Sequence, residues 1–528
     1  MKNIIMALLI ALSGFSISCN NNTNSDSIVV NMWSEPKTID PSLNTMKAVN
    51  VYIIHAFEGL TKLGSNNNVR GGMAESWDIS EDGLKYTFHL RTNAKWSDGK
   101  PVTAKDFEYS WKRALNPKTA SDYSYAMEII KNAEKINAGL MDYDNLGVKA
   151  IDDYTFEVIL ENPTVYFLDF IADTGIFMPL RKDIIETYGD EWTLKPETYI
   201  GNGPYKMTQR LIDDKIVFSI NTNYYSKEEQ IAKKITFILT SDPNTAIAGL
   251  KNGTIHFSAL ETPALEIENL KSENYIYLNN SLGVYYLELN ITNEALKDKR
   301  VRQALSLAID RNYMVSKVIN GIPAGAFVPT QIKGLDGTFR NESKDYIDVN
   351  NHKDNVKKAQ SLMTEAGYNN GENYPILELK VSPGNFLKGE TIQQMWKENL
   401  NITVQLIQEE FTVSIQDLIE KNYQLSRMGW IADYNDPMAI LDVMLSYGGV
   451  NHTGFSNANY DRLILTAKQS PDNRVRMDAM KQAESILMDE MPIIPLYYRL
   501  DALMISPKLK GAIISSLGKH RFNYCYIE

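Results

Sequence analysis

The sequence predicts a mixed α/β protein built from about three domains. Strand-like and helix-like patterns alternate through both halves of the chain, which is typical of mixed α/β domains. The length of 528 residues corresponds to roughly three domains of about 100–200 residues each. No Pro/Ser-rich linker divides the chain after residue 28. We therefore expect the domains to be joined by paired crossovers, an arrangement that allows two lobes to hinge.

Local patterns place the elements of the first half. Residues 84–91 alternate apolar and polar side chains, as a half-buried strand does, and residues 155–160 are their expected partner. Thr103 is placed to cap a helix that ends at residue 115, with Asp106 in its first turn. The predicted strands of this half are 28–33, 84–91, 155–160, 205–210, 216–220 and 234–239, and the predicted helices are 49–60, 103–115 and 245–251.

The second half continues the alternation. Apolar residues at helical spacing predict one long amphipathic helix over 298–318. Gly367 is placed to end another helix. The predicted helices of this half are 298–318, 353–367, 391–399 and 474–488, and the predicted strands are 283–290, 377–381, 403–407, 424–428 and 493–498.

Composition narrows the class of protein. Hydrophobic residues make up 44% of the chain and charged residues 23%, which are ordinary values for a globular protein. The net charge of −11 disfavours broad binding of nucleic acids, because phosphate contacts need clustered Lys and Arg. We therefore expect no nucleic-acid partner. The 29 tyrosines suit polar binding surfaces that contain water.

The N-terminal segment predicts export. Lys2 precedes an apolar run over residues 4–17 that is short for a membrane span and typical of a signal peptide. Cys19 directly follows, as in the bacterial lipobox, where the cysteine becomes the lipid-modified first residue; the lipobox prefers Leu where Ser16 stands. We predict a signal peptide over 1–18, a lipid anchor on Cys19 and a flexible tether over 19–27. The alternative is a plain secretory peptide, with Cys19 incidental.

The search for catalytic or metal motifs yields little. The sequence contains no HExxH, GxSxG, GxxxxGK[ST] or GxGxxG, and its six histidines are far apart. His55 and Glu58 are spaced to share one helix face, and Asp433 and Asp436 are close enough to pair, but a structural role is the simpler interpretation of each. We therefore predict no catalytic residues, no metal and no cofactor.

Within residues 429–437 an aromatic pair, a carboxylate and an Asp-Pro turn follow a predicted strand. A carboxylate at the end of a strand can receive a cation, with a gross attraction of roughly 4–5 kcal/mol at an effective dielectric near 20. Desolvation offsets much of that energy, so Asp433 would select a charged ligand end more than supply affinity. The alternative is a helix-capping aspartate followed by turn chemistry.

At this segment the chain resembles the periplasmic oligopeptide-binding proteins of bacterial ABC importers, a large class of extracellular solute-binding proteins. The resemblance covers essentially all of the chain after the N-terminal segment, and its most specific part is similar to the signature region of the family. The matching segments, in the family's order and spacing, are 74–77, 86–91, 94–99, 101–111, 202–205, 301–311, 366–368 and 430–437.

The resemblance implies a type II periplasmic-binding-protein fold with two lobes around a hinge. In this family an extended peptide lies buried between the lobes, its backbone paired with strand edges and its side chains in hydrated pockets, which makes binding tolerant of sequence. The implied domains are a discontinuous domain I over 28–57, 182–282 and 500–528, a domain II over 58–181, and a domain III that forms the second lobe over 283–499.

Carried over by position, the resemblance also implies peptide-binding residues. Asp433 matches the carboxylate that pairs with the α-amino group of the peptide. Gly429 and Ile431 lie on the strand that offers backbone partners, and Trp430 matches an aromatic residue that lines a pocket.

Three further residues match the walls around the ligand. Tyr123 and Tyr286 match rings on opposing walls, with core packing as the alternative. Arg427 matches a cation that reaches the carboxylate of the ligand, with an internal ion pair as the alternative.

The sequence departs from the family pattern at the pocket. Close relatives carry a disulfide between the positions of Gly283 and Ile431, and both cysteines are absent here. Phe411 replaces a pocket tryptophan. Leu418 and Ile419 stand where close relatives carry basic residues near the C-terminal end of the ligand. We therefore expect weaker capture of the carboxylate, or a preference for other lengths or for apolar residues.

These observations predict an exported, lipid-anchored and monomeric receptor on the periplasmic or extracytoplasmic face of a membrane. It would capture short peptides without catalysis and deliver them to the permease subunits of an ABC importer. The alternatives are another solute (a dipeptide, a cell-wall peptide, a nickel complex or haem), an exported hydrolase, and an adhesin.

Overall fold

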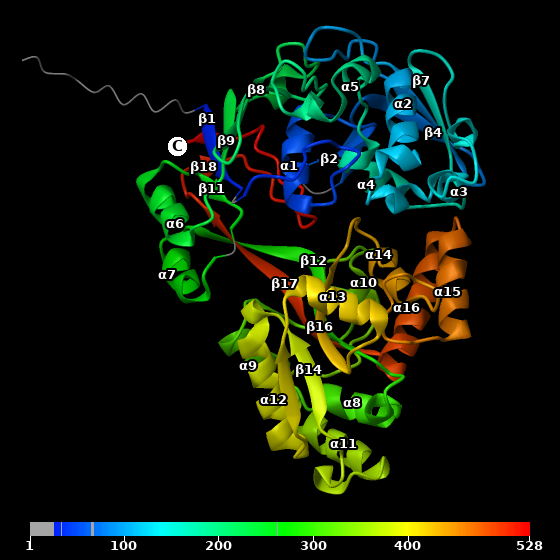
Figure 1. The fold of residues 1–528 in the computed structure, drawn as a ribbon, viewed down its shortest axis with the longest axis vertical. Helices are drawn as coiled ribbons and strands as arrows, with labels where there is room; N and C mark the ends of the chain where they lie inside the picture. Colours follow the sequence, from blue (N-terminus) through cyan, green and yellow to red (C-terminus); the bar gives the residue numbers. More distant parts are fainter. Residues whose placement is uncertain (1–25, 33, 65–67, 261) are drawn as a thin grey trace, which may run out of the picture.

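Two long antiparallel strands, β12 (Ile276–Leu289) and β17 (Ile493–Ile505), run through both lobes of the protein (Figure 1). The computed structural model describes residues 26–32, 34–64, 68–260 and 262–528. The two strands pair in three stretches, because one register shift separates Asn280 from Val284 and a second separates Tyr285 from Tyr286. The strand pair is therefore irregular at the point where the chain passes from one lobe to the other.

Both lobes share one mixed sheet. Its path in the described residues is β15-β14-β16-β12-β17-β11-β1-β10-β9-β8, with β13 paired to β17 as the eleventh strand. β1 pairs in parallel with β10 and β11, and β14 pairs in parallel with β15 and β16. The remaining elements on the first-lobe side are β1 (Ser27–Asn31), α1 (Lys47–Ala56), β8 (Tyr205–Leu211), β9 (Lys215–Ile220), β10 (Lys234–Ile238), α6 (Pro243–Asn252), β11 (Phe257–Ser258), α7 (Ile267–Ser272), β18 (Leu509–Lys510) and β19 (Tyr526–Ile527).

A separate four-stranded sheet, in the order β4-β5-β7-β6, forms the outer part of the first lobe. The predicted pairing of residues 84–91 with 155–160 is confirmed, because β5 (Lys85–Leu90) pairs antiparallel with β7 (Thr155–Ile159). The predicted cap is also present, since the Asp106 carboxylate accepts from the Thr103 N–H at 2.7 Å. The other elements here are β2 (Thr61–Leu63), β3 (Val69–Gly71), β4 (Ala74–Ile79), α2 (Ala104–Leu115), α3 (Ala133–Asn137), β6 (Val148–Ala150), α4 (Phe167–Ile171) and α5 (Lys182–Tyr188).

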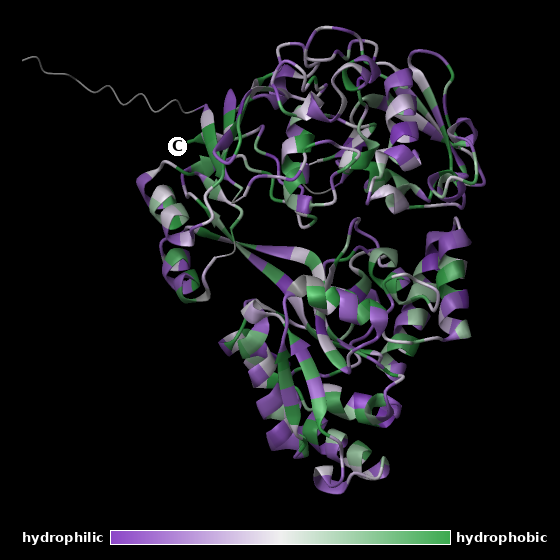
Figure 2. Cartoon of the chain, viewed as in Figure 1, coloured by the Kyte–Doolittle hydropathy of each residue, from purple (hydrophilic) through white to green (hydrophobic). Residues whose placement is uncertain are grey.

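Helices surround the second-lobe part of the shared sheet, and Figure 2 shows hydrophobic residues along its strands with mixed character on the outer helices. Trp396, whose indole N–H donates to the Leu305 carbonyl at 2.7 Å, is completely buried there. The elements are α8 (Lys299–Leu307), α9 (Arg311–Lys317), β13 (Gly321–Pro323), α10 (Phe339–Glu342), α11 (His352–Glu365), β14 (Leu377–Val381), α12 (Phe386–Leu400), β15 (Val404–Gln408), α13 (Phe411–Glu420), β16 (Leu425–Ile431), α14 (Met438–Leu441), α15 (Ala458–Gln469) and α16 (Asn473–Glu490).

The prediction of one helix over 298–318 is wrong, because the chain forms α8 and α9 with a break between them. The buried Arg311 guanidinium donates to the Ser306 carbonyl at 2.9 Å and to the Pro495 carbonyl at 2.8 Å, so it occupies acceptors at the end of α8. Asp310 then starts α9 by accepting from the Tyr313 N–H at 2.9 Å. An arginine inside an amphipathic pattern does not reveal such a tertiary contact.

The predicted signal peptide (1–18) and Cys19 lie outside the described residues, and so does most of the predicted tether. Within the part that is described, Ser27 already belongs to β1. None of the helices in the described ranges has the length and apolar character needed to cross a membrane. Cys525 is buried as a free thiol, and burial raises its pKa well above the ordinary value.

Candidate functional site

Strand β16 carries four of the predicted ligand contacts, Arg427, Gly429, Trp430 and Ile431, on its two faces. Residues that lie directly opposite in an antiparallel pair project to the same face. Gly283 lies opposite Ile431, and Tyr285 opposite Gly429, so these residues share one face. The alternate positions of β16, including Trp430, project to the other face.

A cavity of about 860 Å³ lies on the face that contains Ile431, between the two lobes. The first lobe contributes residues of α1 and of the C-terminal segment to its lining, and the second lobe contributes β16 and β17. Its volume is at the upper end of the range for small-ligand sites. The lining residues used below are Lys47, Ser281, Tyr285, Arg427, Ile431, Tyr497, Arg499, Asp501 and His520.

Arg427 and Tyr285 form a stacked pair on the second-lobe wall of this cavity. The guanidinium carbon lies 4.3 Å from the centre of the Tyr285 ring, and the Tyr497 ring centre is 4.9 Å from that of Tyr285. No carboxylate of the described residues lies within ion-pairing distance of Arg427. The described residues therefore give Arg427 no internal ion pair, and its charged group lies on the wall of the cavity.

The hinge end of the cavity carries a polar cluster. Asp501 accepts hydrogen bonds from the Ser281 hydroxyl and from the Arg499 guanidinium. Arg499 also donates to the Tyr285 hydroxyl at 3.4 Å. Ser281 and Arg499 flank the register shift between β12 and β17, so this cluster ties the two strands together where the lobes meet.

Asp433 lies just after β16, where the loop faces the first lobe. Its carboxylate is 3.6 Å from the ammonium group of Lys47, which belongs to α1, and 29% of its side chain is exposed. The pKa of Tyr125 is raised to about 12, mainly by burial and secondly by the negative charge of Asp433. The same two causes raise the pKa of Tyr123. Both tyrosines therefore lie within electrostatic reach of Asp433, on the facing part of the first lobe.

Tyr125 was not predicted from the sequence. It follows Tyr123 by two residues, and the two rings meet edge to face with centres 5.3 Å apart. More than half of the Tyr125 side chain is exposed. The only sequence signal for Tyr125 is its position two residues after Tyr123, because both tyrosines belong to the same short turn.

Asp436 has a structural role. Its carboxylate receives two hydrogen bonds of 3.0 Å from the buried Arg476 and accepts from the Met438 N–H at the start of α14. The capping alternative therefore describes Asp436 and not Asp433. The contacts of Asp436 with Arg476 and with the Met438 N–H tie its carboxylate into the core of the second lobe.

Two predicted aromatic residues lie away from the cavity. Tyr286 is buried in the second-lobe core, with its ring edge to face against Phe327 at 5.3 Å, so the wall tyrosine of this strand is its neighbour Tyr285. The indole N–H of Trp430 donates to the Ala439 carbonyl at 2.7 Å on the opposite face of β16 from Ile431. Sequence position alone could not decide which of two adjacent tyrosines faces the ligand.

Helix α13 carries three further predicted residues, and those whose side chains are described do not line the cavity. Leu418 is completely buried, whereas 57% of Ile419 is exposed to solvent. Phe411 is the first residue of α13, and its side chain lies outside the described set. In this conformation the structure does not bring α13 together with the cavity residues.

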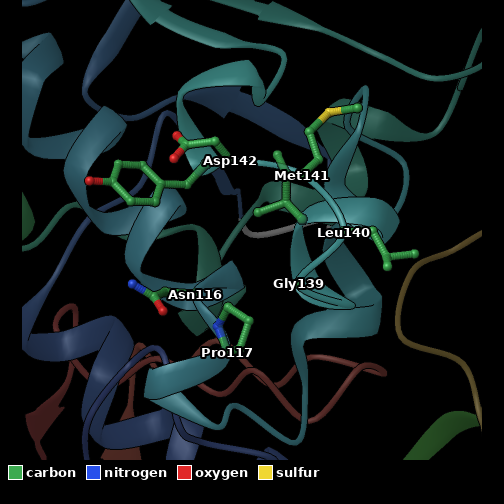
Figure 3. Close-up of a pocket in the computed structure, with 8 residues that line it drawn as sticks. Asn116, Pro117, Gly139, Leu140, Met141 and Asp142 are labelled. Carbon is green, nitrogen blue, oxygen red and sulfur yellow. The ribbon is translucent and has the colours of Figure 1, made fainter.

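A second, shallower pocket of about 360 Å³ lies in the outer part of the first lobe (Figure 3). Asn116 and Pro117 lie on one side of it, and the chain from Gly139 to Asp142 forms the rest of its rim. This pocket contains none of the residues predicted to bind a ligand.

The described residues hold no cluster of three or more potential metal ligands. His55 is fully engaged, since its Nε2 accepts from the Phe522 N–H at 3.0 Å and its Nδ1 lies 2.6 Å from the Val51 carbonyl. Burial lowers the pKa of His55 to about 3. The Glu58 carboxylate forms an ion pair with the Lys62 ammonium group at 2.8 Å. His55 and Glu58 therefore both make internal contacts in the core of the first lobe.

Comparison with known proteins identifies the family. The family model for bacterial extracellular solute-binding proteins, family 5 (middle), matches residues 68–452. The chain belongs to this family. The oligopeptide-binding protein OppA of Bacillus subtilis is 32% identical to this family 5 protein, over 99% of the chain and 98% of the relative.

Solved structures give the same result for the fold. The unliganded open form of MppA, a periplasmic murein tripeptide binding protein, matches with a TM-score of 0.81 and 31% identity over 95% of this chain and 97% of its own. Haemophilus influenzae OppA in complex with RPPGFSPFR matches with a TM-score of 0.77 and 29% identity over 95% and 99%. The predicted type II periplasmic-binding-protein fold is therefore confirmed.

Proposed function

We propose that this protein captures short peptides between its two lobes, outside the cytoplasmic membrane, and delivers them to the permease subunits of an ABC importer. The observation that carries the proposal is the interlobe cavity, which Lys47 and Arg427 line and beside which the Asp433 carboxylate lies 3.6 Å from the Lys47 ammonium group. A peptide in its ordinary ionisation state carries the complementary charges at its two ends. The relatives named above are an oligopeptide-binding protein and a murein tripeptide binding protein, which supports a peptide as the ligand.

Asp433 receives the peptide's α-amino group in this proposal. It is partly exposed, it lies two residues after the strand that lines the cavity, and the tyrosine pair 123 and 125 faces it from the other lobe. Gly429 and Ile431 would pair with the peptide backbone, with Trp430 on the far side of the strand. Main-chain pairing gives affinity that does not depend on the peptide sequence.

Arg427 receives the carboxylate of peptides of suitable length. Its guanidinium is stacked on Tyr285 and has no carboxylate partner among the described residues. A charge-assisted hydrogen bond to a carboxylate is worth roughly twice a neutral one. Phe411, Leu418 and Ile419 of α13 would contact the C-terminal side of the ligand after the lobes close; Tyr286 supports this wall from the core.

The hinge and the anchor complete the proposed receptor. Domain I (28–57, 182–282 and 500–528) and domain II (58–181) would form one lobe and domain III (283–499) the other, with bending at the register shift of β12 and β17. The protein would act as a non-enzymatic monomer, held at the membrane by a lipid on Cys19. A dipeptide, a cell-wall peptide, a nickel complex or haem remains the alternative solute.

The proposal is tested by calorimetry with matched peptides that differ only in N-acetylation. Asp433→Asn removes the charge that pairs with the α-amino group, and a hydrogen bond to a charged group contributes about 1.5–3 kcal/mol. We expect the affinity for the free-amino peptide to fall by about tenfold or more, and the affinity for the acetylated peptide to change much less. Asp478→Asn, an exposed aspartate of α16, is the control. Equal losses for both peptides would refute the assignment of Asp433.

A further inference from the structure

Lys47 reaches from the first lobe to the end of β16, next to the cavity. It is the first residue of α1, and its ammonium group lies 2.7 Å from the Ala432 carbonyl, 3.2 Å from the Ile431 carbonyl and 3.6 Å from the Asp433 carboxylate. These acceptors all belong to the second lobe, at the end of β16. The contact therefore bridges the two lobes next to the cavity that both of them line.

The three acceptors suit any primary ammonium group. A –NH₃⁺ group has three donors and no acceptor, so a carboxylate and two carbonyls can satisfy it. The α-amino group of a peptide is also a primary ammonium in its charged form, and it would make the same set of contacts. Lys47 thus presents, from inside the chain, the chemical group that the proposed function assigns to the ligand.

The local structure of α1 gives no reason for a lysine at this position. Cations are unfavourable at a helix N-terminus, where the backbone N–H groups carry partial positive charge. The first turn of α1 contains no acidic residue, and Met46 before it provides no side-chain cap. The contact with the second lobe is what compensates the charge, since Asp433 is the ion-pair partner of Lys47 in the described residues.

We propose that Lys47 is a tethered competitor for the amino end of the peptide: in the unliganded protein it occupies the Asp433 site, and a peptide with a free amino group must displace it. This inference rests on the proposed function of Asp433. It makes Lys47 a specificity-determining residue, because only ligands with a cation at this end can replace the contacts that the lysine gives up. It also makes the ligand-free contact an autoinhibitory bridge between the lobes.

The electrostatic surroundings support displacement over joint occupancy. Burial between the lobes lowers the pKa of Lys47, and the neighbouring charge of Asp433 opposes that shift. The other charged groups near Lys47 are Arg499 and Asp501, which already pair with each other at the hinge, and the buried Lys519, whose charge also acts on Asp433. A second ammonium group at Asp433 would place two cations at one carboxylate, so Lys47 has to move as the peptide amine enters.

The test compares Lys47→Met with the wild-type protein for a free-amino peptide and its N-acetylated form. Methionine keeps the length and apolar stem of the side chain and removes the competing cation. A partly exposed ion pair with two carbonyl contacts corresponds to about a two- to tenfold change in affinity. We expect the free-amino peptide to bind more tightly to Lys47→Met by that factor, and the ratio of free-amino to acetylated affinity to rise. Lys47→Gln, which shortens the side chain but keeps it polar, should give the same direction.

Lys182→Met is the matched control, because Lys182 is also the first residue of a first-lobe helix, α5, and pairs with Glu186 away from the cavity. It should leave both affinities and their ratio unchanged. In an Asp433→Asn background, Lys47→Met should have no further effect on the free-amino peptide. An unchanged or weakened affinity of Lys47→Met for the free-amino peptide would overturn the inference.

The two proposals fail in distinguishable ways. If Asp433 does not hold the amino end, Asp433→Asn in the wild-type background fails to discriminate free-amino from acetylated peptides. If only the role of Lys47 is wrong, Asp433→Asn still discriminates, while Lys47→Met shows no gain for the free-amino peptide.

Discussion

Substitution of Gly429 by alanine tests the close packing behind the cavity wall. A Cβ atom built on Gly429 would lie 2.5 Å from Cε1 of Tyr285, directly across the strand pair. Non-bonded carbon atoms prefer 3.5–4.0 Å, so the Tyr285 ring would have to move by about 1 Å. That ring is held between the Arg427 guanidinium and the Tyr497 ring, and it cannot move without disturbing both.

We expect Gly429→Ala to destabilise the second lobe by about 1–3 kcal/mol, as overpacking in a well-packed region does. For an unfolding unit of 150–250 residues this corresponds to a melting temperature lower by about 2–4 °C per kcal/mol. Thermal unfolding followed by circular dichroism measures this loss. Calorimetry on the same samples should show weaker peptide binding, because the displaced ring carries Arg427 with it.

Gly449→Ala is the control, since nothing lies within 4 Å of the Cβ atom that it adds. A glycine-to-alanine change without a clash stabilises by about 0.4–1 kcal/mol, so the two variants should differ in sign. A Tyr285→Ala background removes the obstacle, and Gly429→Ala should then cost little. The same loss in both backgrounds, or no loss in either, would refute the argument from Tyr285.

Two further predictions concern stability and cross-linking. Burial lowers the pKa of His520 to about 4, and the charge of Asp501 opposes this shift. The neutral imidazole therefore contributes its full stability above pH 6.5, and up to about 3 kcal/mol of unfolding free energy is lost as the pH falls towards 4. Urea unfolding midpoints between pH 7.5 and 4.5 measure this loss, and an equally steep pH profile for His520→Asn would contradict it. Gly283 and Ile431 lie directly opposite each other in the strand pair. The next pair along carries the hydrogen bond, because the Ala432 N–H donates to the Leu282 carbonyl at 2.8 Å. Residues 283 and 431 are therefore a non-hydrogen-bonded pair, whose Cα atoms are typically about 4.5 Å apart. The double variant Gly283→Cys/Ile431→Cys should therefore form a disulfide under mild oxidation. Mass spectrometry that finds both introduced cysteines still as thiols, with Cys525 as the native free thiol, would show that the pair is not so placed.

Much of the fold could be predicted because its signals are local. Alternation over 84–91 and the Thr103–Asp106 cap depend on residues within a few positions, and the structure confirms both. The predicted helix over 298–318 was wrong because Arg311 contacts Pro495, which is distant in sequence. Strand β17 continues well past the predicted end at residue 498, since the polar residues near the hinge interrupt the apolar pattern without ending the strand.

The candidate site was predictable to the level of segments but not of side chains. Residues 427–433 were correctly placed on one strand and the loop after it, and the structure puts Arg427 and Ile431 on the cavity wall. Tyr286 packs against Phe327, whereas its neighbour Tyr285 lines the cavity, and the sequence did not reveal which face of β12 meets the cavity. Lys47 could not be found from the sequence, because its acceptor Ile431 lies 384 positions away and no motif links them.

The pairing of β12 with β17 has a consequence for how the chain is assembled. β12 and β17 are direct neighbours where the chain passes between the lobes, and Val284 lies directly opposite Tyr498 in the sheet. The polypeptide thus leaves the first lobe and returns to it through two neighbouring strands, in the manner of a domain inserted into a host. Because the two ends of the insert are already adjacent, closing the host around it costs little extra chain entropy, and either part could be exchanged or circularly permuted at this junction without rerouting the other.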